Sequence, residues 1–493
     1  MAIKRYFAEK DNTITNAFEP NLVTRGTGSN MGLADSVEVF SIYAQASSSS
    51  LEAARTLVQF PVTSSEYPNI TTILQDRNNG KIPASGSVNF YLRMFNVAHD
   101  QTVPRNFTLV VSPVSQSWEE GRGVDLDNYS DLTYDGTGSN WINARANTPW
   151  DNQGGDFLTA SSYSEFNYTQ TFDSGIEDLE VDITGLVEKW ITGTAGGGYE
   201  DYGMGVFLTS SQENGTQSYY TKRFSARDSE YFFSRPIIEA RWDSSQKDNR
   251  GNFIVSSSAL SSDNNLNTLY IYNYYRGQLT NLANVDTGSI FVTLHTSASG
   301  GEQLTATPNN PVTGGWVSTG IYSASFALNT TASTVYDRWF SGSTYYNTGS
   351  FSTTTHDPYD YSDIQQYVTN ITNLKESYST SDTARFRLFS RLKDWSPTIY
   401  TVASTAIQNY FVEDAFYKVV RVIDNKDVIS YGTGSTNHTK LSYDTSGSYF
   451  DLDMSLLEPG YLYSIKFSYY LQGSYEEQKK LLTLEWNKWN KNG

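Results

Sequence analysis

The sequence predicts an all-β protein built from three β-sandwich domains in series. Aromatic residues make up 14% of the chain, with 36 Tyr, 25 Phe and 10 Trp, and aromatic residues and threonine favour strands over helices. Short apolar runs alternate with polar residues, as strands with one buried face do. The chain has 493 residues, and at about 150 residues per domain this length suggests three domains.

Residues 1–23 are expected to form an N-terminal arm that precedes the first domain. The segment is largely polar, and it carries the aromatic pair Tyr6-Phe7. Two interpretations stay open. The pair docks on a neighbouring molecule, or the segment is a disordered tail.

A β-sandwich is predicted for residues 24–243. Strand-like runs at 88–94 and 107–111 are separated by turn residues, as in two stacked sheets. One short helix is expected among the strands. Thr184 is a good N-cap for it, apolar residues after Thr184 share a helical face, and Gly193 is a natural stop.

A series of ordered motifs in this region resembles the DNRLRE-type domain, a β-sandwich family similar to carbohydrate-binding modules. The motifs are Asn30-Met31-Gly32, 54–60, Ser117-Trp118-Glu119-Glu120, Gly154-Gly155-Asp156-Phe157, the helix after Thr184, Phe224-Ser225-Ala226-Arg227-Asp228 and 235–242. The resemblance covers the first half of the chain and implies a jelly-roll sandwich there. A long polar insertion at about 125–147 departs from the family pattern.

The second half is expected to hold two smaller sandwiches. Residues 244–265 form a predicted linker, because they are rich in Ser, Asn and Asp. An immunoglobulin-like sandwich is predicted for 266–357, where short strands follow one another. The last domain, 358–493, is expected to be fibronectin- or immunoglobulin-like. Its Pro459-Gly460 turn resembles that of fibronectin-type modules, since Pro presets φ and Gly accepts a positive φ.

Charge and composition exclude several classes of function. Asp and Glu outnumber Lys and Arg by 53 to 35, which gives a net charge of −18 and disfavours a nucleic-acid partner. Cysteine is absent, so disulfides, thiolate metal sites and a cysteine nucleophile are excluded. The sequence shows neither an apolar secretory signal nor a run of about 18 apolar residues. A protein made in the host cytoplasm, without a membrane span, is therefore expected.

Catalytic residues are not evident. The four histidines lie far apart in sequence. Glu119 and Glu120 beside Trp118 could suggest a glycosidase pair. Adjacent residues on a strand point to opposite faces, however, whereas glycoside hydrolysis needs two carboxyl groups in one cleft. Packing of Trp118 in the core is the favoured interpretation, and the protein is predicted not to be an enzyme.

One acidic loop is a candidate calcium site. Asp125, Asp127 and Asp131 are closely spaced, and Ca²⁺ binds six to eight oxygen ligands. The loop has neither the glycine nor the glutamate of an EF-hand at the usual positions. A solvated loop is the favoured interpretation, and no other cofactor is expected.

Three aromatic residues in or beside the same insertion are candidates for glycan binding. Tyr134, Trp141 and Trp150 could stack on sugar rings if they were exposed. Packing of the long loop onto the sheet is the favoured alternative.

Surplus tyrosines are the main sequence argument for assembly. Tyr270, Tyr272, Tyr274 and Tyr275 cannot all be core residues, because neighbours on a strand point to opposite faces. Some of them must be exposed or lie in an interface, where tyrosine is enriched.

The aromatic-rich second half is similar to virion structural proteins of tailed bacteriophages of marine bacteria. A virion also explains the missing export signal, since its parts assemble inside the host and leave by lysis. The predicted function is a non-enzymatic structural component of the capsid, neck or tail, a homo-oligomer that binds other virion proteins. The alternative is a glycan-binding adhesin that recognises a host surface polysaccharide.

Overall fold

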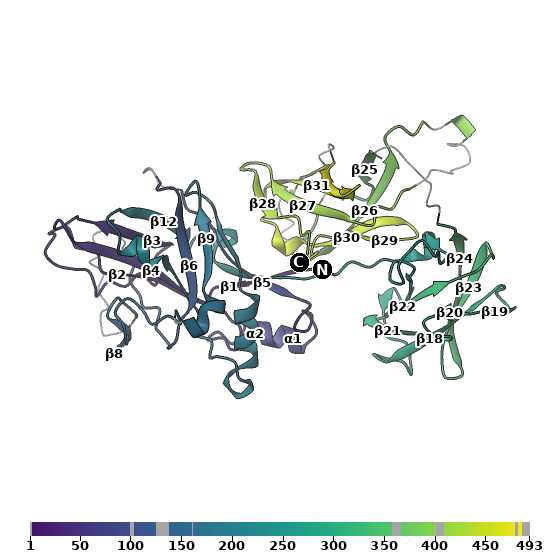
Figure 1. Ribbon diagram of the computed structural model, residues 1–493, viewed down its shortest axis with the longest axis horizontal. Coiled ribbons are helices and arrows are strands. Elements are labelled where there is room, and N and C mark those ends of the chain that lie inside the picture. The colour runs from purple at the N-terminus through teal and green to yellow at the C-terminus, as the bar shows by residue number, and fades with distance from the viewer. Residues whose placement is uncertain are drawn as a thin grey trace. The chain divides into compact units, whose positions relative to one another are not determined.

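The computed structural model describes residues 2–98, 103–124, 138–159, 161–356, 366–375, 377–396, 398–400, 409–478 and 482–485. These residues fold into two compact units, and the boundary between the units in the sequence lies between Asp243 and Ser244. Strands dominate both units and helices are few (Figure 1). This confirms the predicted all-β class. The division of the second unit into two sandwich domains stays a prediction.

Two antiparallel sheets build the first unit. The smaller sheet has the strand order β1-β13-β5-β10, and the larger has the order β12-β3-β4-β11-β6-β9, with β2 paired to β4. The strand bounds are β1 Ile3–Phe7, β2 Lys10–Thr15, β3 Ser36–Tyr43, β4 Leu51–Gln59, β5 Asn89–Met94, β6 Phe107–Pro113, β9 Tyr168–Phe172, β10 Leu179–Asp182, β11 Met204–Leu208, β12 Tyr219–Ser225 and β13 Ile237–Arg241. A short hairpin, β7 Asn143–Arg145 and β8 Thr148–Pro149, lies outside these sheets.

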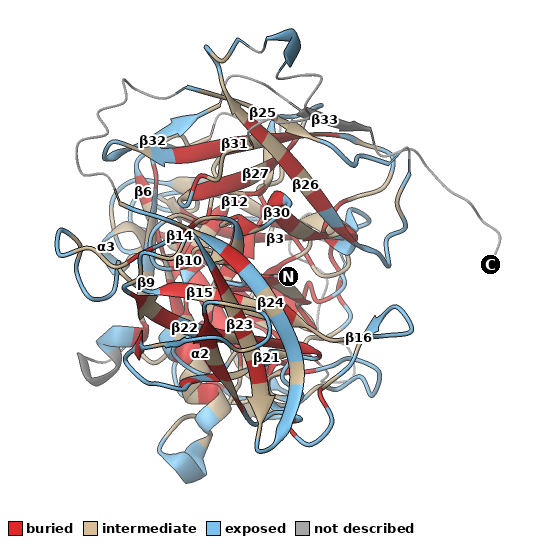
Figure 2. Cartoon of the chain, turned by 90° about the vertical axis from the view of Figure 1, so that its right-hand side faces the viewer, coloured by how far each residue is buried: buried red, intermediate tan, exposed pale blue. Residues whose placement is uncertain are grey.

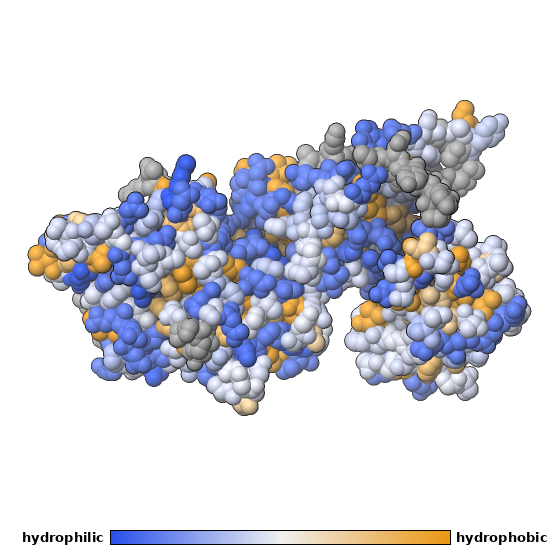
Figure 3. Space-filling view, in the orientation of Figure 1, coloured by the Kyte–Doolittle hydropathy of each residue, from blue (hydrophilic) through white to orange (hydrophobic). Residues whose placement is uncertain are grey.

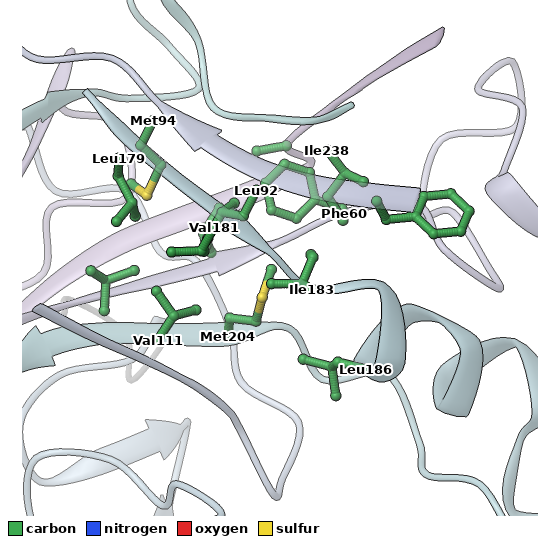
Figure 4. Close-up of a cluster of buried hydrophobic side chains, with 14 of the residues drawn as sticks. Phe60, Leu92, Met94, Val111, Leu179, Val181, Ile183, Leu186, Met204 and Ile238 are labelled. Carbon is green, nitrogen blue, oxygen red and sulfur yellow. The ribbon is translucent and has the colours of Figure 1, made fainter. Parts of the chain in front are cut away.

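The two sheets of the first unit share one hydrophobic core. Leu92 and Ile238 of the smaller sheet and Val111 and Met204 of the larger sheet belong to the same buried cluster (Figure 4). The unit is therefore a two-layered β structure.

Three short α-helices cover parts of the first unit: α1 Ile73–Asn78, α2 Thr184–Thr192 and α3 Ser210–Glu213. The predicted helix after Thr184 is α2, which ends at Gly193 with φ of 64°, as expected. The N-cap prediction was wrong. Helix α2 begins at Thr184 itself, and the Thr184 hydroxyl accepts the backbone N–H of Phe90 at 2.8 Å. The hydroxyl is therefore bonded to the neighbouring strand β5, which the local sequence could not indicate.

The predicted N-terminal arm is also corrected, because residues 3–15 are part of the first unit. β1 pairs with β13 and β2 pairs with β4. Tyr6 is buried in the core, and its hydroxyl donates to the carboxylate of Asp76 at 2.9 Å. The partner strand β13 lies more than two hundred residues along the chain, so local composition gave no sign of this pairing.

Asn30 links the segment just before the polar insertion to Ser139 within it. Its side-chain N–H group donates to the carbonyl oxygens of Glu120 at 2.7 Å and Ser139 at 2.8 Å. Its side-chain oxygen accepts the N–H of Gly123 at 2.9 Å. A Cβ atom on Gly123 would lie 1.5 Å from the Asn30 carbonyl oxygen, so this close approach requires glycine.

Most strands of the second unit belong to three sheets. A nine-stranded sheet has the order β14-β24-β23-β18-β21-β22-β15 with two side strands, a four-stranded sheet has the order β25-β26-β30-β29, and a five-stranded sheet includes β28-β27-β31-β32. The bounds are β14 Phe253–Ile254, β15 Asn267–Tyr272, β16 Tyr274–Tyr275, β17 Gln278–Leu279, β18 Ser289–His295, β19 Gln303–Leu304, β20 Ala306–Thr307, β21 Val312–Ser318, β22 Ile321–Leu328, β23 Thr334–Ser341, β24 Thr344–Thr354, β25 Tyr367–Ile371, β26 Thr383–Leu392, β27 Ala415–Arg421, β28 Lys426–Ile429, β29 Ser442–Asp444, β30 Gly447–Asp453, β31 Leu462–Leu471, β32 Ser474–Glu477 and β33 Leu482–Glu485.

The segment at the start of the second unit is bonded to two of these sheets. The backbone N–H of Asp248 donates to the carbonyl of Tyr443 on β29 at 3.0 Å. The side chain of Asn249 accepts the N–H of Thr268 on β15 at 3.0 Å. Arg250 then forms two hydrogen bonds, of 2.7 and 2.8 Å, with the fully buried carboxylate of Asp337 on β23. The predicted linker is thus an ordered part of the fold at 246–250.

Candidate functional site: a tyrosine surface and a polar hollow

Strand β15 presents tyrosine on its outer face. Leu269 and Ile271 point into the core of the second unit, while Tyr270 and Tyr272 between and after them are half-buried. The two tyrosine rings lie 6.3 Å apart, centroid to centroid, with 23° between their planes. This alternation follows from the period of two residues in a strand.

The hairpin that follows β15 exposes two more tyrosines. Tyr274 and Tyr275 of β16 are each 61% exposed. Arg276 and Gly277 join β16 to β17, and both have positive φ, at 53° and 83°. Two consecutive positive φ values are typical of the tight turns that fit the twist of a hairpin. The exposed rings are therefore carried on a backbone with a defined geometry.

Further apolar residues lie at the same end of the sheet. Trp316, 40% exposed, donates from its indole nitrogen to the side chain of Asn281 at 3.2 Å. The same Asn281 oxygen accepts the N–H of Gly320, whose carbonyl in turn accepts the N–H of Asn273 beside the hairpin. Exposed Val317 follows Trp316. We call Tyr274, Tyr275, Trp316 and Val317 together the tyrosine surface; Tyr274 and Tyr275, as neighbours on β16, point to opposite faces of the hairpin.

This surface confirms the prediction that the four tyrosines of 270–275 cannot all be core residues. On the face shown in Figure 3, hydrophobic residues (orange) are scattered among hydrophilic ones (blue). Strand β24 is exposed along most of its length (Figure 2). Large apolar groups at a protein surface are typical of interaction sites when they gather in one place.

A polar hollow of about 410 Å³ lies beside Tyr270 and Tyr272. Its walls come from distant parts of the second unit, and the residues that matter for its chemistry are Asp248, Arg250, Tyr270, Tyr272, Asn347 and Asp444. β24, which carries Asn347, and β29, which carries Asp444, are labelled in Figure 1. Its volume is in the range of about 300–1,000 Å³ that is typical of ligand sites.

Burial and mutual repulsion shape the charges of the hollow. Burial raises the pKa of Asp248 to about 6, and the negative charge of Asp444 adds to this rise. Burial also raises the pKa of Tyr272 above its ordinary value, with the neighbouring Tyr449 and both carboxylates acting in the same direction. Burial lowers the pKa of Arg250, but its bonds to Asp337 outweigh this effect and raise the pKa overall.

The candidate glycan-binding tryptophans are packed in the first unit. Trp141 is 7% exposed and Trp150 is 4% exposed, and both belong to one hydrophobic cluster with Trp118. The indole N–H of Trp150 donates to the carbonyl of Asn140 at 2.8 Å, and the guanidinium of Arg55 lies 5.2 Å from the Trp141 ring. Neither indole offers an open face to a sugar in this arrangement. Tyr134, the third candidate, lies outside the described residues.

The candidate calcium ligands Asp125, Asp127 and Asp131 also lie outside the described residues. Within the described ranges, no group of three or more His, Asp or Glu side chains is arranged to hold a metal ion. Calcium binding by this loop stays a hypothesis.

The two glutamates after Trp118 have separate partners. Glu120 forms two hydrogen bonds with Arg227, at 2.9 and 3.1 Å, and Glu119 accepts the N–H of Gly138 at 3.2 Å. Trp118 is buried and donates to the carbonyl of Tyr202 at 2.9 Å. These contacts give Trp118 and both glutamates a structural explanation.

Sequence reasoning missed the hollow. Its residues come from four segments that lie up to about two hundred positions apart in the chain, so no local spacing could reveal it. The sequence contains one indication of the hollow: the spacing of Tyr270 and Tyr272 places both on the outward face of their strand.

Comparison with known proteins identifies no family. No protein-family model matches the chain, and no curated protein matches it. Among solved structures, it is similar over 47% of its length to the Yersinia pseudotuberculosis adhesin InvE, at 11% identity and a TM-score of 0.15, and spans 56% of the adhesin chain. A marsupial T cell receptor is 8% identical over 47% of this chain and 68% of the receptor chain, with a TM-score of 0.14. TM-scores this low support no conclusion about fold or function.

Across the described ranges, no helix has the length and apolar character needed to cross a membrane.

Proposed function

We propose that this chain is a non-enzymatic structural component of a tailed-phage virion. It joins copies of itself and other virion proteins through the tyrosine surface. The proposed architecture is a DNRLRE-like sandwich followed by two immunoglobulin- or fibronectin-like sandwiches, which present interaction faces in series. The location in the particle is the capsid, the neck or the tail.

The observation that carries the proposal is the exposure of Tyr274 and Tyr275 on an ordered hairpin beside Trp316. Tyr and Trp are enriched in interfaces because they bury a large area with few rotatable bonds. The −18 net charge keeps unassembled copies soluble, since like charges repel one another. These features support assembly rather than catalysis.

Peptide mass spectrometry on density-purified particles tests the virion assignment, with unfractionated host cells and medium as controls. Strong enrichment of peptides in the particles is expected. Peptides that occur in cells or medium and never in particles would overturn the proposal.

A variant then tests the tyrosine surface. The double change Tyr274→Ser and Tyr275→Ser is expected to abolish incorporation into particles while leaving the far-ultraviolet circular dichroism unchanged. Tyr231→Ser is the matched control, because Tyr231 is 63% exposed but lies in the first unit. Equal incorporation of the double variant and the control would contradict the role of this surface.

The alternative proposal is a glycan-binding adhesin. The packed rings of Trp141 and Trp150 give it no support. The observation that favours it is the polar hollow of the second unit.

A further inference from the structure

The hollow beside β15 combines an aromatic platform with fixed polar groups. Tyr270 and Tyr272 supply the aromatic groups, because residues two apart on a strand point to the same face; their ring centroids lie 6.3 Å apart with 23° between the planes. Both residues are partly exposed and line the hollow, so a ligand in the hollow can contact them. Aromatic faces carry partial negative charge and attract the partly positive C–H groups of a saturated ring.

The carboxylate of Asp444 is held in place and still has room to accept a hydrogen bond. Arg387 donates to Oδ1 at 2.7 Å and to Oδ2 at 2.8 Å, and the N–H of Ser446 donates to Oδ1 at 2.8 Å. A carboxylate oxygen accepts about two hydrogen bonds. Oδ2 therefore keeps an acceptor position, and the guanidinium fixes its direction.

Asp248 and Asn347 complete the set of polar groups. Asp248 accepts the N–H of Arg250 at 3.1 Å through Oδ1, and it is almost fully buried. Asn347 is exposed at the rim on β24, where its amide offers both a donor and an acceptor. Together with Asp444, these groups favour a ligand that carries several hydroxyl groups.

The charges argue against other ligand classes. An anion would meet two carboxylates, while the guanidinium of Arg250 already donates from both terminal nitrogens to Asp337. A phosphate or sulfate needs donors that are free to turn toward it. A metal ion needs a closer set of ligands than the described residues provide. A wholly apolar ligand would leave buried Asp248 without a new partner.

We infer that this hollow binds a neutral saccharide, with one sugar ring against Tyr270 and Tyr272 and its hydroxyls donating to Asp248 and Asp444. Asn347 contacts the ligand at the rim. The inference does not depend on the virion assignment, because a saccharide site of this kind serves equally a protein that binds a cell surface by another route.

The test uses the full chain and an array of neutral oligosaccharides that end in glucose, galactose, mannose or N-acetylglucosamine. Sialylated and sulfated glycans and a choline-containing probe are included for comparison. Binding of at least one neutral oligosaccharide is expected, with no binding of the charged probes. Binding of none of the neutral oligosaccharides, or preferential binding of anionic glycans or choline, would overturn the inference.

Variants locate the site. Tyr270→Ala with Tyr272→Ala is expected to weaken binding about tenfold or more, which corresponds to about 1.4 kcal/mol. Since the double change could disturb β15, Asn347→Ala provides a second variant at an exposed position, with an expected loss of about threefold. Thr348→Ala is its matched control, because this neighbour points to the other face of β24.

The two proposals fail in different ways. Unchanged glycan binding in both the tyrosine and the Asn347 variants would overturn the saccharide site, whatever the particle analysis shows. Glycan binding by a protein that never enters particles would overturn the virion assignment and leave the saccharide site supported.

Discussion

The two units use aromatic residues differently. Among the residues of the first unit whose burial is described, the exposed aromatic residues lie outside the strands, at Tyr67, Tyr231 and Phe232, while the tryptophans are buried. In the second unit most exposed aromatic residues among the described ones lie on strands, including Tyr274 and Tyr275 on β16 and others on β21, β24 and β32, whereas Tyr400 lies outside the strands. A ring on a strand has a direction fixed by the sheet, so it can meet a partner without prior ordering.

The second unit therefore carries more aromatic surface than its fold needs. Its core already contains Trp339, Tyr322 and several phenylalanines, all buried. The exposed tyrosines add little to stability, because they remove little area from water. A role in binding explains their exposure better than a role in folding.

The largest expected effect contrasts a buried aromatic residue with an exposed one. Trp190→Ala in α2 removes a ring that is 2% exposed, and it should lower the free energy of unfolding by about 4 kcal/mol. Tyr274→Ala should change it by no more than about 0.5 kcal/mol. Urea unfolding followed by circular dichroism measures both. A loss of more than about 2 kcal/mol for Tyr274→Ala would mean that the tyrosine surface supports the fold.

The next effect concerns the ion pairs of the second unit. Asp337 is fully buried and binds both Arg250 and the indole nitrogen of Trp339, the latter at 2.6 Å. Asp337→Ala should therefore cost about 3 kcal/mol, because it leaves a guanidinium and an indole N–H without their partner.

Asp451→Ala is the matched control for that change. The Arg385–Asp451 pair lies at the surface, where the arginine side chain is 43% exposed, and such pairs contribute less than about 1 kcal/mol. Equal costs for Asp337→Ala and Asp451→Ala in urea unfolding would contradict a structural role for the buried pair.

A pH effect is expected in the first unit. Burial raises the pKa of Asp11 from 3.8 to about 8, so the folded chain holds a proton that the unfolded chain has lost. The stability from this group is present below about pH 4 and is lost as the pH rises to about 8, by at most about 1.4 kcal/mol per pH unit. Asp201, with a pKa raised by burial to about 7, acts in the same direction.

Amide hydrogen exchange of peptides from β2 and β4 measures this effect at pH 5 and pH 8, after correction for the intrinsic exchange rate. Asp11→Asn should reduce the difference, because the amide keeps an acceptor for the N–H of Arg227 and carries no charge. An unchanged pH dependence in this variant would show that Asp11 does not control it.

The smallest expected effect on stability concerns the N-terminal cap of α1 in the first unit. Thr72 and Gln75 form a capping box at the start of α1, and Thr72→Ala should cost about 1 kcal/mol. Thr192→Ala near the end of α2 is the control. Its hydroxyl donates to the carbonyl of Glu188 within the helix, and its loss should change stability by a few tenths of a kcal/mol. Hydrogen exchange of the two helices compares them.

Several parts of the structure follow from short-range rules. The alternation in β15 requires that Tyr270 and Tyr272 share a face opposite Leu269 and Ile271, whatever the fold. Gly193 ends α2 because it accepts a positive φ. The linker composition predicts a boundary after Asp243, and the first compact unit ends at that residue.

Other parts depend on neighbours that the local sequence does not name. Thr184 has the residue type of an N-cap, but its hydroxyl accepts a hydrogen bond from the N–H of Phe90 on β5. Trp141 and Trp150 have the composition of a sugar platform, but a shared cluster with Trp118 buries them. In each case a long-range contact decided between two uses that the residue type allows equally.

By itself, therefore, the sequence determined the all-β class, the outward tyrosines of β15 and the end of α2, since these depend on periods of two residues and on the backbone freedom of glycine. Tertiary structure alone decided that β1 and β2 join the first unit and that Asp248, Asn347 and Asp444 meet beside Tyr270. Strand pairing and the walls of a hollow join residues far apart in the chain, and their stabilisation comes from packing and hydrogen bonds that exist only once those residues are in contact.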